Sequence, residues 1–162
     1  MLNPGTITDA VVATLQAIPA LASAMTADGP DGPIVRIAAY HYLLGQELRL
    51  AETIYKMPAP SILVVWEGTQ GGNFSGYAIW KHRIAVYLRM GNAAGIVEPV
   101  GYEDLWWTIC NAVPSTSTVN IRYTNILPEL DIMDNPSIAH LLDEDQIDIF
   151  RGEFVFPEIG DN

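Results

Sequence analysis

The sequence predicts an α+β fold: a single domain in which two main amphipathic helices pack on a mixed or antiparallel β-sheet. Residues 7–18 and 102–113 repeat apolar side chains at helical spacing. In residues 77–90, mainly apolar positions alternate with positions that include three cations. Residues 62–66 form a short continuous apolar run. Both patterns are typical of strands. The resulting order of helix, strands, helix and strands favours an α+β arrangement.

Length and composition limit the possible classes. The chain has 162 residues, enough for one domain over residues 1–162, with 49% hydrophobic and 17% charged residues, which excludes wholesale disorder. No apolar run approaches the roughly 20 residues of a membrane helix, so no membrane partner is expected. No Lys or Arg precedes Arg36, so a secretory leader is not expected. The single Cys110 excludes an internal disulfide and suggests a reducing cytosol.

The first element is expected to be a helix over residues 7–18. Thr6 and Asp9 have the spacing of a capping box, which places the helix start at Thr6. The apolar stripe that follows is Ile7, Val11, Leu15 and Ile18. Pro19 is expected either to kink this helix or to start a second short turn at residues 21–25.

A turn and two strands follow in the prediction. Residues 28–33 read Asp-Gly-Pro-Asp-Gly-Pro, and a flexible loop is expected near 27–33. Residues 34–40 are rich in β-formers and predict one strand. Residues 41–57 fit a helix in part, but Gly45 argues for a break. Residues 62–66 predict a strand that is buried on both faces.

The clearest strand covers residues 77–90. One face is expected to be core and contains Trp80, His82, Ile84, Val86 and Leu88. The other face carries the cations Lys81, Arg83 and Arg89, and is either a solvent face or an interface with acidic residues. The glycine-rich segment 68–76, with Gly71 and Gly72, predicts a mobile hairpin loop before this strand.

The last part of the chain predicts a flexible loop near 91–100, a helix over 102–113 and two closing strands. The helix has the apolar stripe Tyr102, Leu105, Trp106, Ile109 and Val113, with Glu103 and Asp104 in its first turn and Pro114 at its end. Trp107 falls outside the stripe, which suggests a contact surface. The closing strands are residues 119–123 and 148–156, with a helical turn at 137–142.

No segment has the pattern of a catalytic, cofactor or metal site, and the chain is not expected to be an enzyme. The glycine segment lacks the Gly-Lys-Ser/Thr ending of a phosphate-binding loop. His41, His82 and His140 are scattered, and Cys110 has no nearby base. The acids Asp143, Glu144, Asp145 and Asp148 lack the pattern of a calcium loop and are expected to form a solvated patch.

Charge is distributed unevenly along the chain. The formal net charge is −11, of which residues 126–162 contribute −9 and residues 1–125 only −2. A basic surface for phosphate groups is missing, so specific nucleic-acid binding is not expected. The acidic C-terminal third is interpreted as a solubilising surface, or as one that faces a basic partner or repels DNA.

Several segments together resemble the tail terminator (tail completion) proteins of tailed bacteriophages, including the Mu-like branch. The matching positions are the N-terminal helix 7–18, the segment 60–68, the long strand 79–89, Gly101-Tyr102 at the start of a helix, and the acidic closing strand 148–156. Residues 34–57 do not contribute to the resemblance. None of the matching motifs is a catalytic signature.

The resemblance implies a structural virion protein of the tail and neck, assembled in the bacterial host cytoplasm. Such proteins form a homo-oligomeric ring, usually a hexamer, on the last ring of tail tube protein, and present a surface to the head-side connector protein. DNA passes through the central hole without specific binding. An acidic channel wall would let DNA slide, a hypothesis that fails if the acids of residues 129–148 lie on the outer wall.

Contact residues are predicted from charge and exposure. Lys81, Arg83 and Arg89, together with the glycine segment, are expected to contact a neighbouring subunit or the tube. The cluster Asp143, Glu144 and Asp145 is the expected complementary surface, since cyclic rings use two different surfaces of each protomer. Trp107 is a candidate apolar anchor.

Three alternatives remain open at this point. A head-closure or head-tail connector protein would share the ring and the channel. A carboxylate-dependent metal enzyme, such as a nuclease with Asp143, Asp145 and Asp148, would need bound divalent metal and basic surface for its substrate. A small-molecule module built on Trp66, Trp80 and Trp106 competes with the simpler interpretation of these aromatics as core.

Overall fold

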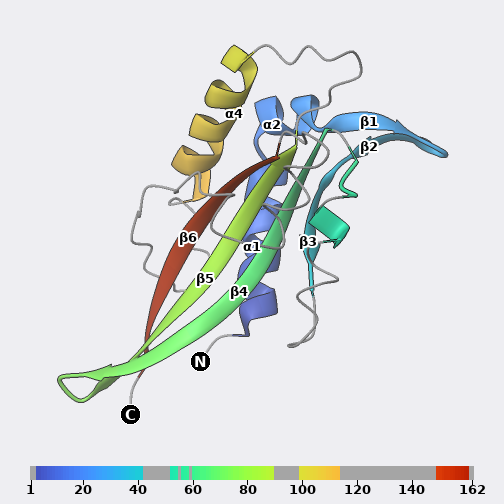
Figure 1. Cartoon of the computed structure of the whole chain (residues 1–162). Coiled ribbons are helices and arrows are strands. Elements are labelled where there is room, and N and C mark those ends of the chain that lie inside the picture. Colours follow the sequence, from blue (N-terminus) through green and yellow to red (C-terminus); the bar gives the residue numbers. More distant parts are fainter. Residues whose placement is uncertain are drawn as a thin grey trace.

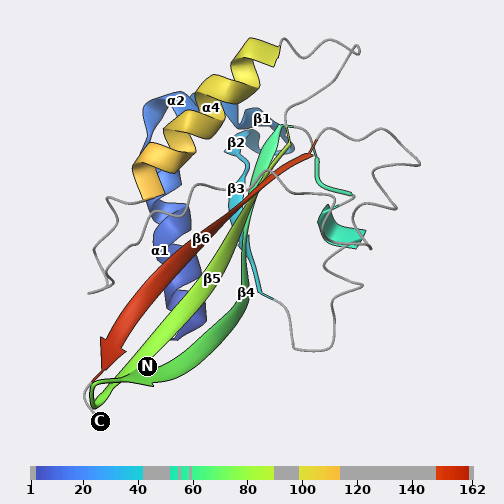
Figure 2. The same ribbon diagram turned by 60° about the vertical axis from the view of Figure 1, so that its left-hand side comes forward.

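Three helices cover one face of a four-stranded sheet in the computed structural model, which describes residues 3–41, 52–54, 56–58, 60–89, 99–113 and 149–160 (Figures 1 and 2). The strand order is β3-β4-β5-β6, with β3 parallel to β4 and the other neighbours antiparallel. A separate two-stranded sheet, β1-β2, lies beside the β3 edge (Figure 1). The α+β class with a mixed sheet is therefore confirmed.

Helix α1 spans Pro4–Gln16, and its start differs from the prediction. Asn3 is the N-cap, and its side chain accepts a hydrogen bond from the Gly5 amide at 2.9 Å. Thr6 lies inside the helix, so the capping box predicted at Thr6 was wrong. Asn is at least as good an N-cap as Thr, and Pro4 supplies the preset φ that favours the first helical position.

The break between the first two helices follows from Pro19. Helix α2 spans Pro19–Ala24, and Ile18 before it is extended, with φ −87° and ψ 112°. A residue before proline is forced out of the helical region, which ends α1 before Ile18. The second of the two predicted outcomes, a new short helical segment, is therefore the one observed.

The segment expected to be a flexible turn followed by one strand forms three strands. Strands β1 (Thr26–Gly29) and β2 (Gly32–Val35) form a hairpin, so the turn is reduced to Pro30 and Asp31. Strand β3 (Ile37–Tyr40) begins after Arg36 and joins the other sheet. Arg36 lies between β2 and β3 and contacts both sheets. Its amide donates to the Met25 carbonyl next to β1, and its own carbonyl accepts from the amide of Ile62 on β4.

Strands β4 (Ser61–Phe74) and β5 (Tyr77–Arg89) form a hairpin much longer than expected. The predicted loop over residues 68–76 was wrong, because Gly68 to Phe74 continue the ladder against β5. Only Ser75 and Gly76 make the turn, with φ of 51° and 85°, as the twist of a two-residue hairpin requires. Continuous pairing with β5 overrides the weak strand propensity of glycine.

Strand β6 (Ile149–Gly160) pairs with β5 along its whole length and forms one edge of the sheet. The prediction ended this strand at Phe156, before Pro157. Proline is tolerated in an edge strand because its missing N–H faces away from the ladder. The ladder therefore continues to the Ala78–Gly160 pair.

Helix α4 spans Pro99–Ala112, so it begins earlier than predicted and takes the last two residues of the expected 91–100 loop. Glu103 and Asp104 consequently lie beyond its first turn, contrary to the prediction. Ile109 and Val113 are buried as expected, and Leu105 packs partly buried against the core. The predicted strand 119–123 and helical turn 137–142 lie outside the described residues.

The core lies between the sheet and the helices. Its buried members come from or adjoin α1, α2 and α4, and from β3, β4, β5 and β6: Ile7, Val11, Leu15, Leu21, Met25, Ile37, Ile62, Val64, Ile84, Val86, Leu88, Ile109, Cys110, Val113, Phe154 and Phe156. None of the described helices has the length and apolar character needed to span a membrane.

Candidate interaction surfaces

The β4–β5 hairpin beyond residue 67, together with its turn, forms an arm (residues 68–83) that extends past the helices (Figures 1 and 2). Gln70 to Asn73 and Ser75 to Tyr77 are exposed, and the Tyr77 ring is 53% exposed at the tip. Gly71 and Gly72 both lie in this arm, where they border a hollow of about 240 Å³ together with Lys81. The predicted contact segment is therefore exposed, but it is a paired strand.

Gly71 is required by close packing across the arm. The ring of Trp80, its cross-strand partner, lies over it, and a Cβ on Gly71 would come 2.4 Å from a ring carbon. Gly72 has open space at the same position. An aromatic side chain that covers a strand glycine replaces the packing that the glycine lacks. Trp80, proposed as a possible ligand-binding aromatic, instead fills this place in the arm.

A β-bulge sets which side chains face the helices at the base of the arm. The register shifts between Trp66 and Gly68, and Gly68 has φ +146°, a value that favours glycine. The extra residue, Glu67, accepts a hydrogen bond from the Tyr87 hydroxyl at 2.8 Å. As a result, Thr69 faces His82 across the ladder, and Gly68 pairs with Arg83.

A chain of hydrogen bonds, the polar line, crosses the sheet at this bulge. Trp66 Nε1 donates to Thr69 Oγ1 at 3.1 Å, Thr69 Oγ1 is 2.8 Å from His82 Nδ1, and His82 Nε2 is 2.8 Å from Glu158 Oε2. All groups are satisfied when the Thr69 hydroxyl donates to Nδ1 and Nε2–H donates to the carboxylate. The line thus ties β4, β5 and β6 together.

The order hydroxyl, imidazole, carboxylate is also that of a nucleophilic triad, but here each of the three groups is bound within the polar line. His82 is fully buried, the Glu158 side chain is only 12% exposed, and the Thr69 oxygen already accepts from Trp66. The Thr69 hydroxyl is therefore already engaged, by Trp66 on one side and by His82 on the other. The polar line is a structural tie, and the sequence pattern had identified only the inward direction of His82.

The three predicted cations of β5 have different environments. Arg83 forms a two-point ion pair with Glu153 of β6, with both N–O distances 2.8 Å. Arg89 is half-buried, and its guanidinium donates to the Met57 carbonyl. Lys81 is exposed. The expected cationic face therefore shrinks to the arm, and Arg83 already has an acidic partner from the C-terminal third of its own chain.

The β5 face that carries the cations is not an ordinary solvent face, because its other residues, Ala85 and Tyr87, are buried. Ala85 and Tyr87 have no exposed surface, and Val65 beside them on β4 has none either. Residues 52–54 lie on this side of the sheet, opposite the helices (Figure 2). Ile54 and Met57 of that region are themselves buried, so the base of the sheet is covered on both faces.

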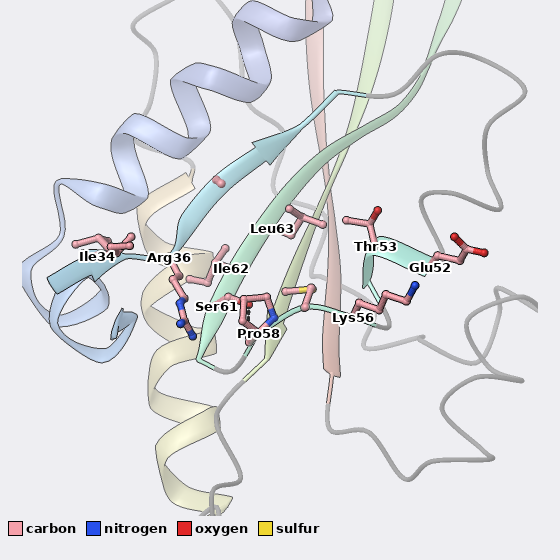
Figure 3. Close-up of a pocket in the computed structure, with 12 residues that line it drawn as sticks. Ile34, Arg36, Glu52, Thr53, Lys56, Pro58, Ser61, Ile62 and Leu63 are labelled. Atoms are coloured by element: carbon pink, nitrogen blue, oxygen red, sulfur yellow. Dashed lines mark hydrogen bonds between the residues drawn. The ribbon is translucent and has the colours of Figure 1, made fainter. Parts of the chain in front are cut away.

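A groove of about 570 Å³ opens where β2, β3 and the start of β4 meet residues 52–53 and 56–58 (Figure 3). Its lining is mainly apolar: Ile34, Val35, Ala38, Met57, Pro58, Ile62 and Leu63. Ile34 and Val35 are also 45% and 40% exposed, so the apolar surface continues outside the groove. The charged residues that line it are Arg36, Lys56 and Glu52. No pattern in the sequence indicates this groove, because its walls come from distant segments.

Trp107 on α4 is 64% exposed, as predicted from its place outside the apolar stripe. Asp104, one turn earlier, is exposed as well. Cys110 lies on the buried side of the same helix, and burial raises the pKa of its thiol to about 11, so the thiol is protonated at neutral pH. The predicted acidic cluster Asp143, Glu144 and Asp145 lies outside the described residues.

The titratable residues with known placement do not assemble into a metal-binding group. Within residues 3–41, 52–89 and 99–113 and strand β6, so far as these are described, three or more His, Cys, Asp or Glu side chains do not converge. His41 instead pairs with Asp9 at 3.2 Å on the surface. Trp66, the other described aromatic of the small-molecule alternative, is tied into the polar line.

Comparison of the chain with protein-family models, with curated proteins and with solved structures finds no match in any of the three.

Proposed function

We propose that this protein is a structural assembly protein of a bacteriophage tail, of the tail-terminator type, which forms a ring on the end of the tail tube. The observation that carries the proposal is the arm. It is a long hairpin with an exposed tip, a glycine-rich strand and an exposed aromatic at Tyr77, and it extends beyond the part of the sheet that the helices cover.

The construction of the arm suits a contact with a separate partner. Its base is fixed by the polar line and by the Arg83–Glu153 pair, and β6 pairs with β5 as far as the Ala78–Gly160 pair, so the tip is held in one direction. A rigid projecting element loses little conformational entropy when it binds. We assign the tip to the tail tube protein and the remainder of the surface to neighbouring subunits and the head-side connector.

Electrostatics is in keeping with a DNA passage. The chain has a formal net charge of −11, so a ring of six copies carries strong negative charge. Such a ring offers few cations to retain phosphate groups, and DNA can move through it without specific contacts. This part of the proposal depends on the ring and would fall with it.

The first test is the mass of the purified protein by light scattering after gel filtration, with negative-stain imaging of any large species. We expect a ring with a central hole, formed either by the protein alone or on addition of the tail tube protein of the same phage. A protein that stays monomeric with and without tube protein would overturn the proposal.

A second test measures whether the tip of the arm contacts the tail tube, separately from whether the protein forms a ring. Tyr77→Ala is expected to weaken binding to tail tubes at least about 10-fold in a co-sedimentation assay, since an exposed aromatic at an interface centre is a common energetic anchor. Tyr77→Phe is the matched control and should keep most of the affinity. Equal binding by wild type and Tyr77→Ala would remove the tip from the contact.

A further inference from the structure

The described surface contains an apolar knob and an apolar groove that cannot meet within one chain. The knob is Trp107, the most exposed of the large apolar side chains whose exposure is known. It lies on α4, on the helix-covered side of the sheet, whereas one wall of the groove is formed by residues 52–53 and 56–58 on the other side (Figures 2 and 3). A contact between the two surfaces therefore needs a second copy.

The two surfaces also carry opposite charge. The groove is lined by Arg36 and Lys56 against the single acid Glu52. In the view of Figure 3, Arg36 and Lys56 lie on opposite sides of Ser61. Helix α4 contains two acids and no base over Pro99–Ala112, and its exposed Asp104 lies one turn before Trp107. The surface of α4, where the exposed Asp104 lies beside the Trp107 knob, is thus complementary in charge to a groove that Arg36 and Lys56 help to line.

Size is consistent with this match. The groove, at about 570 Å³, is within the range of clefts that hold small organic molecules, so it has room for an indole ring. A tryptophan that leaves water on binding buries about 150–250 Å² and is among the side chains most often found as interface anchors.

We infer that Trp107 of one copy inserts into the groove of the next copy, with Asp104 beside Lys56, and that this is a head-to-tail interface of the protein. Because knob and groove are different surfaces, each copy has one of each, and repetition of the contact gives a ring if the rotation closes. The inference rests on the proposed ring in naming its interface, but head-to-tail association can be measured without tail components.

The test uses sedimentation equilibrium of the full chain with matched variants. Trp107→Ala is expected to weaken self-association about 30-fold, the size of an interface hot spot, while Tyr77→Ala at the arm tip should leave it unchanged. Asp104→Lys and Lys56→Glu should each weaken it, and the double variant should recover most of the loss. Failure of the double variant to recover would remove the charge contact.

Complementation tests the head-to-tail arrangement directly. Trp107→Ala keeps the groove, and Ala38→Trp fills the groove but keeps the knob, since Ala38 is exposed and lines it. At a concentration at which wild type associates but the weakened Trp107→Ala does not, neither variant should associate alone, whereas their mixture should give a species of twice the chain mass of 17.7 kDa. A mixture that stays at the chain mass would overturn the inference, as would a wild-type protein that is monomeric at about 1 mM.

The outcomes separate the two proposals. Rings that form equally well from wild type and Trp107→Ala would overturn the knob-and-groove contact and leave the ring proposal standing. Trp107-dependent open chains that never close or cap a tail tube would support the contact and overturn the proposed function.

Discussion

The base and the arm of the β4–β5 hairpin use the same two strands but are stabilised in different ways. At the base, Val64 and Val65 point to opposite faces and are both fully buried, as are Val86 and Tyr87 on β5. In the arm, Gln70 to Asn73 are exposed, and the side-chain contacts that add to the backbone pairing of β4, β5 and β6 are few and specific: Trp80 over Gly71, and the polar line. The difference shows that one strand pair can change from hydrophobic burial to individual polar and aromatic contacts within a few residues.

The largest expected loss of stability comes from a cavity in the core beside the base of the hairpin. Phe154→Ala removes a fully buried ring from the core and should lower the free energy of unfolding by about 3–5 kcal/mol. Tyr77→Ala is the matched truncation in the arm, where the ring is 53% exposed, and should change it by less than about 0.5 kcal/mol. Urea unfolding followed by tryptophan fluorescence measures both. Similar losses for the two variants would contradict the division between base and arm.

An intermediate effect is expected from one added methyl group in the arm. Gly71→Ala places a Cβ 2.4 Å from the Trp80 ring and should cost about 1–3 kcal/mol as the ring shifts. Gly72→Ala, the next residue of the same strand, meets open space and should be neutral or slightly stabilising. Thermal unfolding compares the pair. Equal melting temperatures would show that Trp80 does not pack on Gly71.

A comparable or smaller effect is expected from the polar line. Thr69→Val keeps the side-chain shape but leaves Trp66 Nε1–H and His82 Nδ1 without partners, which should cost about 1–3 kcal/mol. Asp9→Asn is the control, because it alters a histidine–carboxylate pair that is exposed at 57% and 67%, where the cost should stay below about 0.5 kcal/mol. Urea unfolding distinguishes them. A neutral Thr69→Val would mean that the polar line does not hold the arm.

The sequence predicted best where periodicity was long and unbroken. The alternation of residues 77–90 located β5 to within one residue and identified His82 as inward-facing, and the helical stripe around Ile109 located α4. The exposure of Trp107 followed from the same stripe. These features depend on local spacing, which a single segment contains in full.

Most of the predictions that were wrong concern contacts between distant segments. The glycine segment 68–76 has the composition of a loop, and only its pairing with β5 makes it a strand. A proline normally ends a strand, and β6 continues past Pro157 only because β6 lies at the edge of the sheet. The predicted capping box at Thr6 failed for a local reason, because the Asn3-Pro4 pair competes more strongly for the helix start.

By itself, the sequence determined the α+β class, the two long amphipathic helices, the β5 strand and its inward face, and the exposed tryptophan of α4. Only the tertiary structure decided the length of the arm, the polar line at its base, the division of the β5 cations and the groove between β2, β3 and residues 52–53 and 56–58. The reason is that periodicity records which side of an element meets the core. Arms, ties and grooves depend instead on which elements become neighbours, and that is set by long-range pairing energies spread over the whole sheet.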